Sequence, residues 1–207
     1  MVLRFGKGSP FVDFRLPCGS GLDILVDPFP DPRAIAQAVE RLDARTTATL
    51  ALPCTLEGGL ALRTYIPSIR LVICGSGPET EWLRELATGL GVASLVAGPE
   101  NRLALGVVPQ MPVDDWTAIA LLFHDHEWEH QLAPWSLSTN AFYIGAMGGA
   151  RARDDRRSML ARRGFSDQEI DRIRSPLGLI KRARDARVLA LSVMSEVLER
   201  YEEQCRH

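Results

Sequence analysis

Two histidines and an aspartate stand together at His124, Asp125 and His126. Imidazole groups titrate near neutral pH and both donate and accept hydrogen bonds, so such a triplet suits ligand binding. The apolar run at 118–123 predicts a buried strand, and open α/β sheets bind ligands beyond the carboxyl ends of their strands. The triplet is therefore a candidate ligand-binding site; the alternative is that loop carbonyls satisfy both histidines.

The five residues from His126 to His130 also match H-E-x-x-H, the signature of zinc peptidases. That signature requires both histidines on one face of a helix, a glutamate as general base and a third ligand elsewhere. Because the segment follows a strand so closely and Pro134 comes soon after, we expect His126 in a strand-end loop. The spacing therefore favours coincidence over zinc catalysis.

A second candidate is the turn containing Gly75 and Gly77, between a predicted strand and a predicted helix. Here Gly75 permits a tight turn, and Gly77 lets a phosphate approach backbone N–H groups at the helix N-terminus. The dinucleotide fingerprint has a third glycine where this chain has Thr80, and an acid where it has Ala97. The pattern favours a Rossmann-like fold more than NAD binding; the alternative is a turn that binds nothing.

A third candidate begins at Tyr143, where a predicted strand runs into a loop containing Gly145, Gly148 and Gly149 and then into an arginine-rich helix. Glycines in such a loop let a flat ligand or a phosphate approach the backbone. Arg151, at the start of that helix, can add charge-assisted hydrogen bonds. The alternative is an ordinary strand-to-helix connection.

The order of the expected elements places all three candidates on one kind of fold. Strands are expected at 11–16, 22–26, 47–52, 60–65, 69–74, 92–97, 118–123 and 141–144, and helices from Pro32, at 79–90, at 151–163 and at 188–201. The alternation after residue 68 predicts an α/β, Rossmann-like parallel sheet with helices on both faces. We therefore expect a small α+β N-terminal region, 1–67, and a Rossmann-like C-terminal domain, 68–207.

Composition excludes several classes of protein. The chain has 207 residues, of which 46% are hydrophobic and 24% charged, which is typical of a globular protein. No run approaches the ~20 apolar residues of a membrane span, and the start lacks the pattern of a secretory signal. The net charge of −2 argues against a nucleic-acid partner. Four cysteines without C-x-x-C spacing predict free thiols and a cytoplasmic protein.

Charge is nevertheless unevenly distributed. Residues 151–187 contain eleven arginines and one lysine against six acids, so the rest of the chain is acidic. Such asymmetry indicates either a face that meets an anion or an acidic partner, or a solvated helical face with alternating charges.

Taken together, the segments around these candidates resemble the xanthine dehydrogenase accessory protein (XdhC) family. The resemblance lies in F-H-D-H-E at 123–127, A-F-Y-I-G-A-M-G at 141–148, G-F-S at 164–166, I-R-S-P-L-G-L at 173–179 and L-S-V-M-S-E at 191–196, with G-S-P-F at 8–11 and L-P-C-G-S-G-L-D at 16–23. These stretches keep the family's order and cover most of the chain with gaps.

The resemblance implies a non-catalytic chaperone that binds the molybdenum cofactor (molybdopterin, in mono- or dinucleotide form) and aids its sulfuration and insertion. The implied partners are an apo molybdenum hydroxylase subunit of the xanthine or CO dehydrogenase type, a cysteine desulfurase and a second copy of the chain. The implied cofactor-binding residues are Cys18, Gly75, Gly77, His124, Asp125, His126, Tyr143, Gly145, Gly148 and Arg151. Cys18 offers a thiolate, the soft ligand that suits molybdenum or its sulfur; the alternative is a small buried hydrophobe.

The chain departs from the family at several positions. Phe123, Arg174 and Gly149 stand where members have threonine, histidine and serine, and the glycine-rich segment usual upstream is missing. These differences indicate a shortened and divergent member. Two alternatives stay open: an NAD(P)-dependent oxidoreductase on the same fold, and a degenerate interaction module that binds no small molecule.

Overall fold

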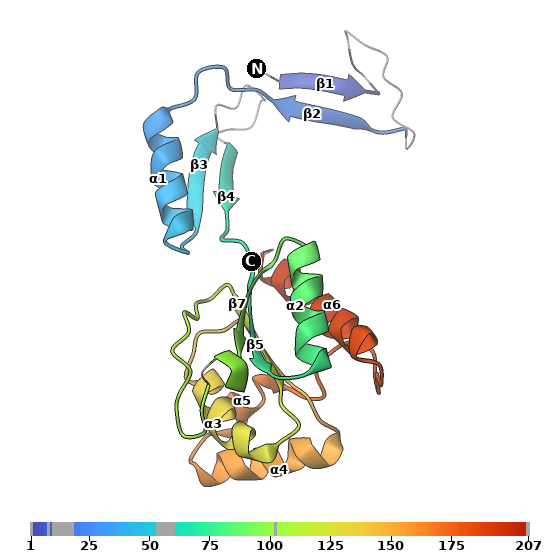
Figure 1. Cartoon of the computed structure of the whole chain (residues 1–207). Helices are drawn as coiled ribbons and strands as arrows, with labels where there is room; N and C mark the ends of the chain where they lie inside the picture. The colour runs from blue at the N-terminus through green and yellow to red at the C-terminus, as the bar shows by residue number, and fades with distance from the viewer. Residues whose placement is uncertain (1, 8, 10–18, 53–60, 102, 206–207) are drawn as a thin grey trace. The chain divides into compact units, whose positions relative to one another are not determined.

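The computed structural model describes residues 2–7, 9, 19–52, 61–101 and 103–205. They form two compact units, residues 1–67 and residues 68–207 (Figure 1). The strand expected at 11–16 and Cys18 lie outside the described residues. Each unit has its own internal contacts and is described separately.

The N-terminal unit combines two antiparallel strand pairs with one helix. Strand β1 (Val2–Gly6) pairs with β2 (Gly21–Leu25), and β3 (Ala48–Leu52) pairs with β4 (Ala61–Tyr65). Helix α1 (Pro32–Asp43) starts where the sequence predicts, because Asp31 Oδ1 accepts a hydrogen bond from the Arg33 N–H and Pro32 occupies the first turn.

The second unit is built on a five-stranded parallel sheet. Its strands are β5 (Arg70–Gly75), β6 (Ala93–Ala97), β7 (Thr117–Leu122), β8 (Tyr143–Ala146) and β9 (Ile173–Arg174), in the spatial order β6-β5-β7-β8-β9. Every strand pair is parallel, which confirms the Rossmann-like fold expected from the sequence. All six residues of β7 are buried, as expected for a central strand covered on both faces.

Helices cover the two faces of this sheet. Leu71 and Ile73 of β5 pack toward α2 (Pro78–Gly89) and α6 (Ala186–Gln204), whereas Val72 packs with residues of α3 (His126–Leu137) and α4 (Ala150–Arg162). This alternation follows from the two-residue period of a strand. A short helix α5 (Asp167–Ile170) follows α4, and its N-cap Ser166 forms a capping box with Glu169. Among the described helices, none is long and apolar enough to cross a membrane.

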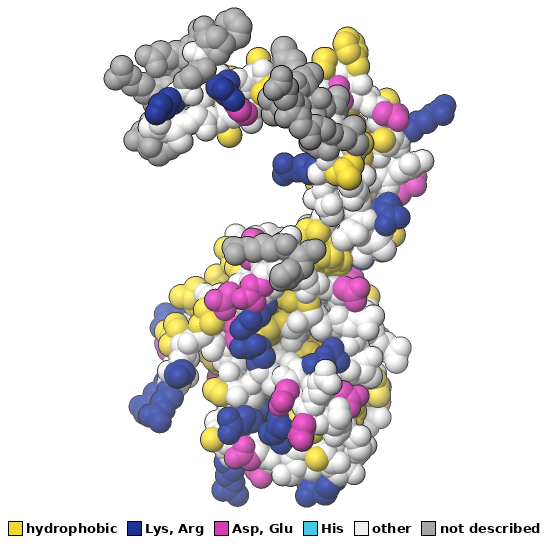
Figure 2. Space-filling view, turned by 180° about the vertical axis from the view of Figure 1, so that it is seen from behind, with side chains coloured by type: hydrophobic (Ala, Val, Ile, Leu, Met, Phe, Trp, Pro, Cys, Tyr) yellow, Lys and Arg dark blue, Asp and Glu magenta, His cyan; other side chains and the backbone are white. Residues whose placement is uncertain are grey.

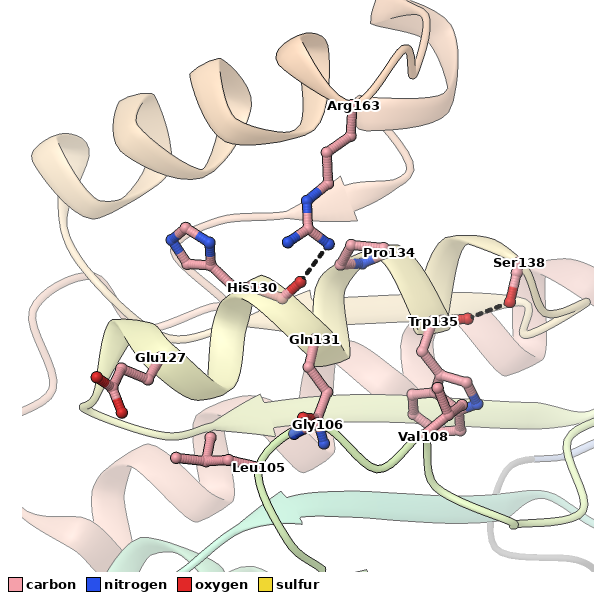
Figure 3. Close-up of a pocket in the computed structure, with 10 residues that line it drawn as sticks. All are labelled: Leu105, Gly106, Val108, Glu127, His130, Gln131, Pro134, Trp135, Ser138 and Arg163. Carbon is pink, nitrogen blue, oxygen red and sulfur yellow. Dashed lines mark hydrogen bonds between the residues drawn. The ribbon is translucent and has the colours of Figure 1, made fainter.

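Helix α3 corrects one expectation. The sequence predicts His126 in a strand-end loop. In the structure it is the first residue of a twelve-residue helix whose N-cap is Asp125. Pro134 lies inside this helix and cannot donate a backbone hydrogen bond to His130. The Arg163 guanidinium donates to that His130 carbonyl instead, at 2.6 Å, so the helix continues past the proline (Figure 3).

Candidate functional site

The carboxyl ends of β7 and β8 open onto a cavity of about 340 Å³, which we call the edge cavity. It is bounded by Glu79 of α2, His124 after β7, residues 147–149 after β8, and the loop that precedes α6. Of the residues singled out in the sequence, His124, Gly148 and Gly149 meet here. This is the place where the fold presents ligands in open α/β sheets.

The edge cavity carries charges of both signs. Arg182 and Arg184 line it, both are exposed, and within the described residues neither side chain has a hydrogen-bond or ion-pair partner. Asp185 is engaged elsewhere: it caps α6 and binds Arg187, whose side chain lowers the pKa of Asp185 to about 2. The remaining acid, Glu79, lies 3.6 Å from His124, measured from Oε1 to Nε2.

The N-terminus of α4 adds backbone donors beside the cavity. Its N-cap is Gly149, which has no side chain to satisfy the first N–H groups of the helix. Gly148 has a φ of +116°, and a Cβ there would lie 2.7 Å from the Cβ of Ala152. The loop can therefore fold closely over the helix end only with glycine at that position.

Arg151 lies on the outside of α4. Its side chain is 97% exposed, it faces Asp155 at 3.9 Å, and it is not among the residues that line the edge cavity. Arg153 and Arg157 also pair with neighbouring aspartates. Figure 2 shows the same mixture of basic and acidic side chains on the face that it draws. Most of the arginine-rich segment is thus a solvated surface of alternating charge. At the edge cavity, Arg182 and Arg184 have no side-chain partner within the part of the chain that the structure describes.

Beneath the glycine loop lies a buried ion pair that the sequence reading missed. The Arg156 side chain is 2% exposed, and its Nη2 lies 2.5 Å from Glu129 Oε1. The same guanidinium donates to the Met147 carbonyl at 2.9 Å and to Ser175 Oγ at 3.0 Å. The sequence does contain a signal for this burial. Arg156 precedes Leu160 by four residues, so both lie on the same, apolar face of α4.

Tyr143 and Gly145 fit each other inside β8. A Cβ on Gly145 would lie 2.8 Å from the ring carbons of Tyr143, so the glycine makes room for that ring. Tyr143 is buried and its hydroxyl donates to Glu196 Oε2 at 2.6 Å; burial, together with this hydrogen bond, raises the pKa of Tyr143. The sequence predicts that Gly145 lets a ligand approach the backbone. In the structure, a glycine is needed at this position because the Tyr143 ring fills the space of a side chain.

Glu196 and Ser192 of α6 hold the far wall of the edge cavity. Glu196 accepts hydrogen bonds from Arg174 Nε at 2.8 Å and from the Gly178 N–H at 2.6 Å, besides that from Tyr143. Ser192 Oγ accepts from the Ile180 N–H at 2.6 Å. The loop that carries Arg182 and Arg184 is therefore anchored at its start to the last helix.

The glycine turn after β5 faces a different cavity, of about 650 Å³, which we call the turn cavity. A Cβ on Gly75 would lie 2.9 Å from the Cβ of Leu122, and Gly77 has a φ of +86°. Thr80, at the third fingerprint position, packs onto Gly75, and its hydroxyl is buried with no hydrogen-bond partner among the residues that the structure describes. Gly77 caps α2 without a side chain. The turn therefore needs both glycines for its shape.

Asp125 and His126, the other two residues of the triplet, lie at the start of α3. Asp125 Oδ1 accepts from the Glu127 N–H and so caps α3, which starts at His126. Cys74 is fully buried, and burial raises the pKa of its thiol to about 12, which keeps it protonated and unreactive. Within the described part of the chain, His, Cys, Asp and Glu side chains form no group of three that could hold a metal ion.

A larger cavity, of about 810 Å³, lies along α3 (Figure 3). Glu127 and His130 of the H-E-x-x-H segment line it, and the other candidate ligand-binding residues do not. Gln131 fastens the loop at its rim, because its side chain accepts from the Gly106 N–H and donates to the carbonyls of Ala104 and Val107. Trp135 and Val108 give the cavity an apolar lining.

Comparison with known proteins identifies the family and the fold. The sequence profile of the XdhC Rossmann domain matches residues 71–197. The Escherichia coli (strain K12) protein named molybdenum cofactor insertion chaperone PaoD is 30% identical over 223 aligned positions, which cover 98% of this chain and 68% of that protein.

A solved structure from Bacillus halodurans, described as a xanthine dehydrogenase, shares the fold. It superposes with a TM-score of 0.66 at 15% sequence identity, covering 84% of this chain and 68% of that one. The profile match extends over more than half of the sequence. It includes the lining of both cavities at the carboxyl edge of the sheet, the glycine loop and the first part of α6. The resemblance found in the sequence is thereby confirmed, and the chain belongs to the XdhC family.

Proposed function

We propose that this protein is an accessory factor that binds the molybdenum cofactor, aids its sulfuration and delivers it to an apo molybdenum hydroxylase subunit. Family membership and the name of the E. coli relative support the proposal. The observation that carries it is the edge cavity at the carboxyl end of the sheet. A glycine loop lines this cavity together with two arginines that have no side-chain partner among the described residues.

The residues of the edge cavity fit a flat anion as cargo. The volume of about 340 Å³ lies in the range of small-molecule sites. Gly148 and Gly149 leave backbone N–H groups accessible, and arginines bind phosphate through charge-assisted hydrogen bonds. The pterin and its phosphate match these donors, and the cofactor would bring molybdenum chemistry that belongs to the client enzyme.

The donor set also suits a protein that must release its cargo. Arg182 and Arg184 are exposed, so water and salt screen their attraction for an anion. Backbone N–H groups and screened cations bind reversibly, whereas covalent capture would oppose transfer. We propose the apo hydroxylase subunit as the acceptor, a cysteine desulfurase as the sulfur source and a homodimer as the assembly.

The proposed function predicts that the protein carries cofactor when it is made in a competent host. Protein purified from molybdate-fed cells should contain molybdenum and a fluorescent pterin in equal amounts, measured by elemental analysis and by fluorescence after oxidation. Protein from a strain that cannot make molybdopterin is the control and should contain neither. If the two preparations have the same metal and pterin content, the protein does not bind the cofactor.

We propose Cys18 as the thiol that contacts molybdenum or its terminal sulfur. A Cys18→Ser protein should retain its fold but lose most of the sulfurated fraction of its cofactor, because a hydroxyl is a poor ligand for a soft centre. Cyanide-releasable sulfur per molybdenum measures that fraction. Cys74→Ser changes a buried, protonated thiol and is the matched control. Equal sulfuration in Cys18→Ser and the unmodified protein would remove Cys18 from the site.

A second candidate function, nucleotide binding, has one observation in its favour. The turn cavity contains the buried Thr80 hydroxyl, which has no hydrogen-bond partner in the described part of the chain. It lies near the N-terminus of α2, which no side chain caps, and phosphates bind at such helix ends in Rossmann-like folds. A rise of Tm with NADP⁺ and none with pterins would favour an oxidoreductase. Unchanged Tm with both, together with co-purification of a hydroxylase subunit, would favour an interaction module.

A further inference from the structure

The edge cavity combines an acid and cations that are not paired with one another. Glu79 lines it from the first turn of α2, and Arg182 and Arg184 line it from the loop before α6. We propose that Glu79 binds the N–H edge of a fused 2-amino-4-oxopyrimidine ring while the two arginines bind the phosphate of the same molecule. This inference rests on the proposed function and names the groups that recognise its cargo.

Glu79 has a free acceptor to offer. Its side chain is 20% exposed, and its Oε1 faces His124 Nε2 at 3.6 Å. The 3.6 Å separation is longer than a hydrogen bond, and no other polar partner of Glu79 is found among the described residues, so both carboxylate oxygens are available. A carboxylate accepts two parallel N–H bonds from a planar donor pair, as it does from arginine. The ring nitrogen N–H and the 2-amino group of a pterin form such a pair.

Arg182 and Arg184 are presented from a loop that α6 anchors. Ser192 and Glu196 accept from the N–H groups of Ile180 and Gly178, just before the two arginines. Within the described residues, neither guanidinium has a protein acceptor, whereas most arginines of the 151–187 segment bind an aspartate, a glutamate or a carbonyl. Two unpaired guanidiniums in a cavity are a phosphate-binding arrangement.

This pairing of groups discriminates among ligands. Nicotinamide and adenine lack the adjacent ring N–H and amino donors, so Glu79 would gain no paired hydrogen bonds from them. Guanine has the same donor edge as a pterin, and a guanine nucleotide also carries phosphate. The shared chemistry is therefore the aminopyrimidinone edge with a phosphate, and the test must separate the two sources.

Binding of neopterin monophosphate, measured by fluorescence titration, tests the proposal, with inorganic pyrophosphate as a probe of the cationic end alone. Glu79→Gln should weaken neopterin monophosphate binding about tenfold without weakening pyrophosphate binding, since the variant only removes a negative charge from the cavity. The double variant Arg182→Gln, Arg184→Gln should abolish pyrophosphate binding and weaken neopterin monophosphate binding about tenfold or more. Glu199→Gln and Arg162→Gln change exposed residues of α6 and α4 outside the edge cavity and are the matched controls.

The outcomes separate this inference from the proposed function. If the unmodified protein retains molybdenum cofactor but both variants bind the probes as it does, the residue assignment is wrong and the function stands. If the protein retains no cofactor yet binds neopterin monophosphate through Glu79, the assignment stands and the function fails. If guanosine monophosphate binds as tightly as neopterin monophosphate, the assignment of a pterin is overturned.

Discussion

Replacing Arg156 by alanine is expected to lower the free energy of unfolding by about 3–5 kcal/mol. The substitution removes the buried guanidinium that pairs with the Glu129 carboxylate, and it removes the donors that hold the Met147 carbonyl and Ser175. A buried carboxylate that loses this cation is strongly destabilising, because water cannot replace the lost interaction. Urea unfolding followed by circular dichroism measures the change.

Arg157→Ala is the matched control, because Arg157 is the next residue of α4 and also pairs with acids, Asp167 and Asp171. Those pairs are exposed and screened by solvent, so little change is expected. If Arg156→Ala and Arg157→Ala shift the urea midpoint equally, the buried pair contributes no more to the free energy of unfolding than the exposed pairs do. The double variant Arg156→Leu, Glu129→Leu should be more stable than Arg156→Ala, because it leaves no unpaired charge.

Gly145→Val is expected to destabilise the domain by about 3 kcal/mol, in addition to any loss of cofactor. From the sequence alone, this glycine was expected to face a ligand, and a valine there would then block binding and spare the fold. In the structure a side chain at residue 145 collides with the Tyr143 ring, whose hydroxyl is held by buried Glu196. Moving the ring breaks that hydrogen bond and overpacks the core.

Gly149→Ala is the control, because it adds a side chain to the same loop at a position where that side chain meets no neighbour. Gly149 has a φ of −77°, and no atom lies within 4 Å of a Cβ placed there, so an alanine should leave the unfolding transition nearly unchanged. Thermal unfolding of the two variants side by side is the measurement. A Gly145→Val protein as stable as the Gly149→Ala protein would contradict the packing role of Gly145.

Much of the fold could be predicted because it depends on local patterns. The apolar run at β5 and the Gly-Pro start of α2 predict a strand and a helix without any knowledge of their neighbours. Helix α3 was missed because Pro134 indicates a break, and the group that compensates for it, Arg163, lies 33 residues away from His130. No local pattern contains that hydrogen bond.

The location of the candidate site could be predicted from the sequence better than the contacts of its residues. His124 and Gly148 meet at the edge cavity because parallel strands end at one side of the sheet. The buried contacts of Glu129 with Arg156 and of Tyr143 with Glu196 join residues separated by 27 and 53 positions. Such pairs arise from tertiary packing, so the residue types alone could not reveal them.

The anchoring of the cavity wall by α6 has a consequence for biosynthesis. Glu196 and Ser192 are translated after every other element of the domain, and they fix the loop that starts at Gly178. While this helix is still inside the ribosomal exit tunnel, that wall has no anchor. We therefore expect ligand to load into the edge cavity only after this helix has left the tunnel and packed on the domain.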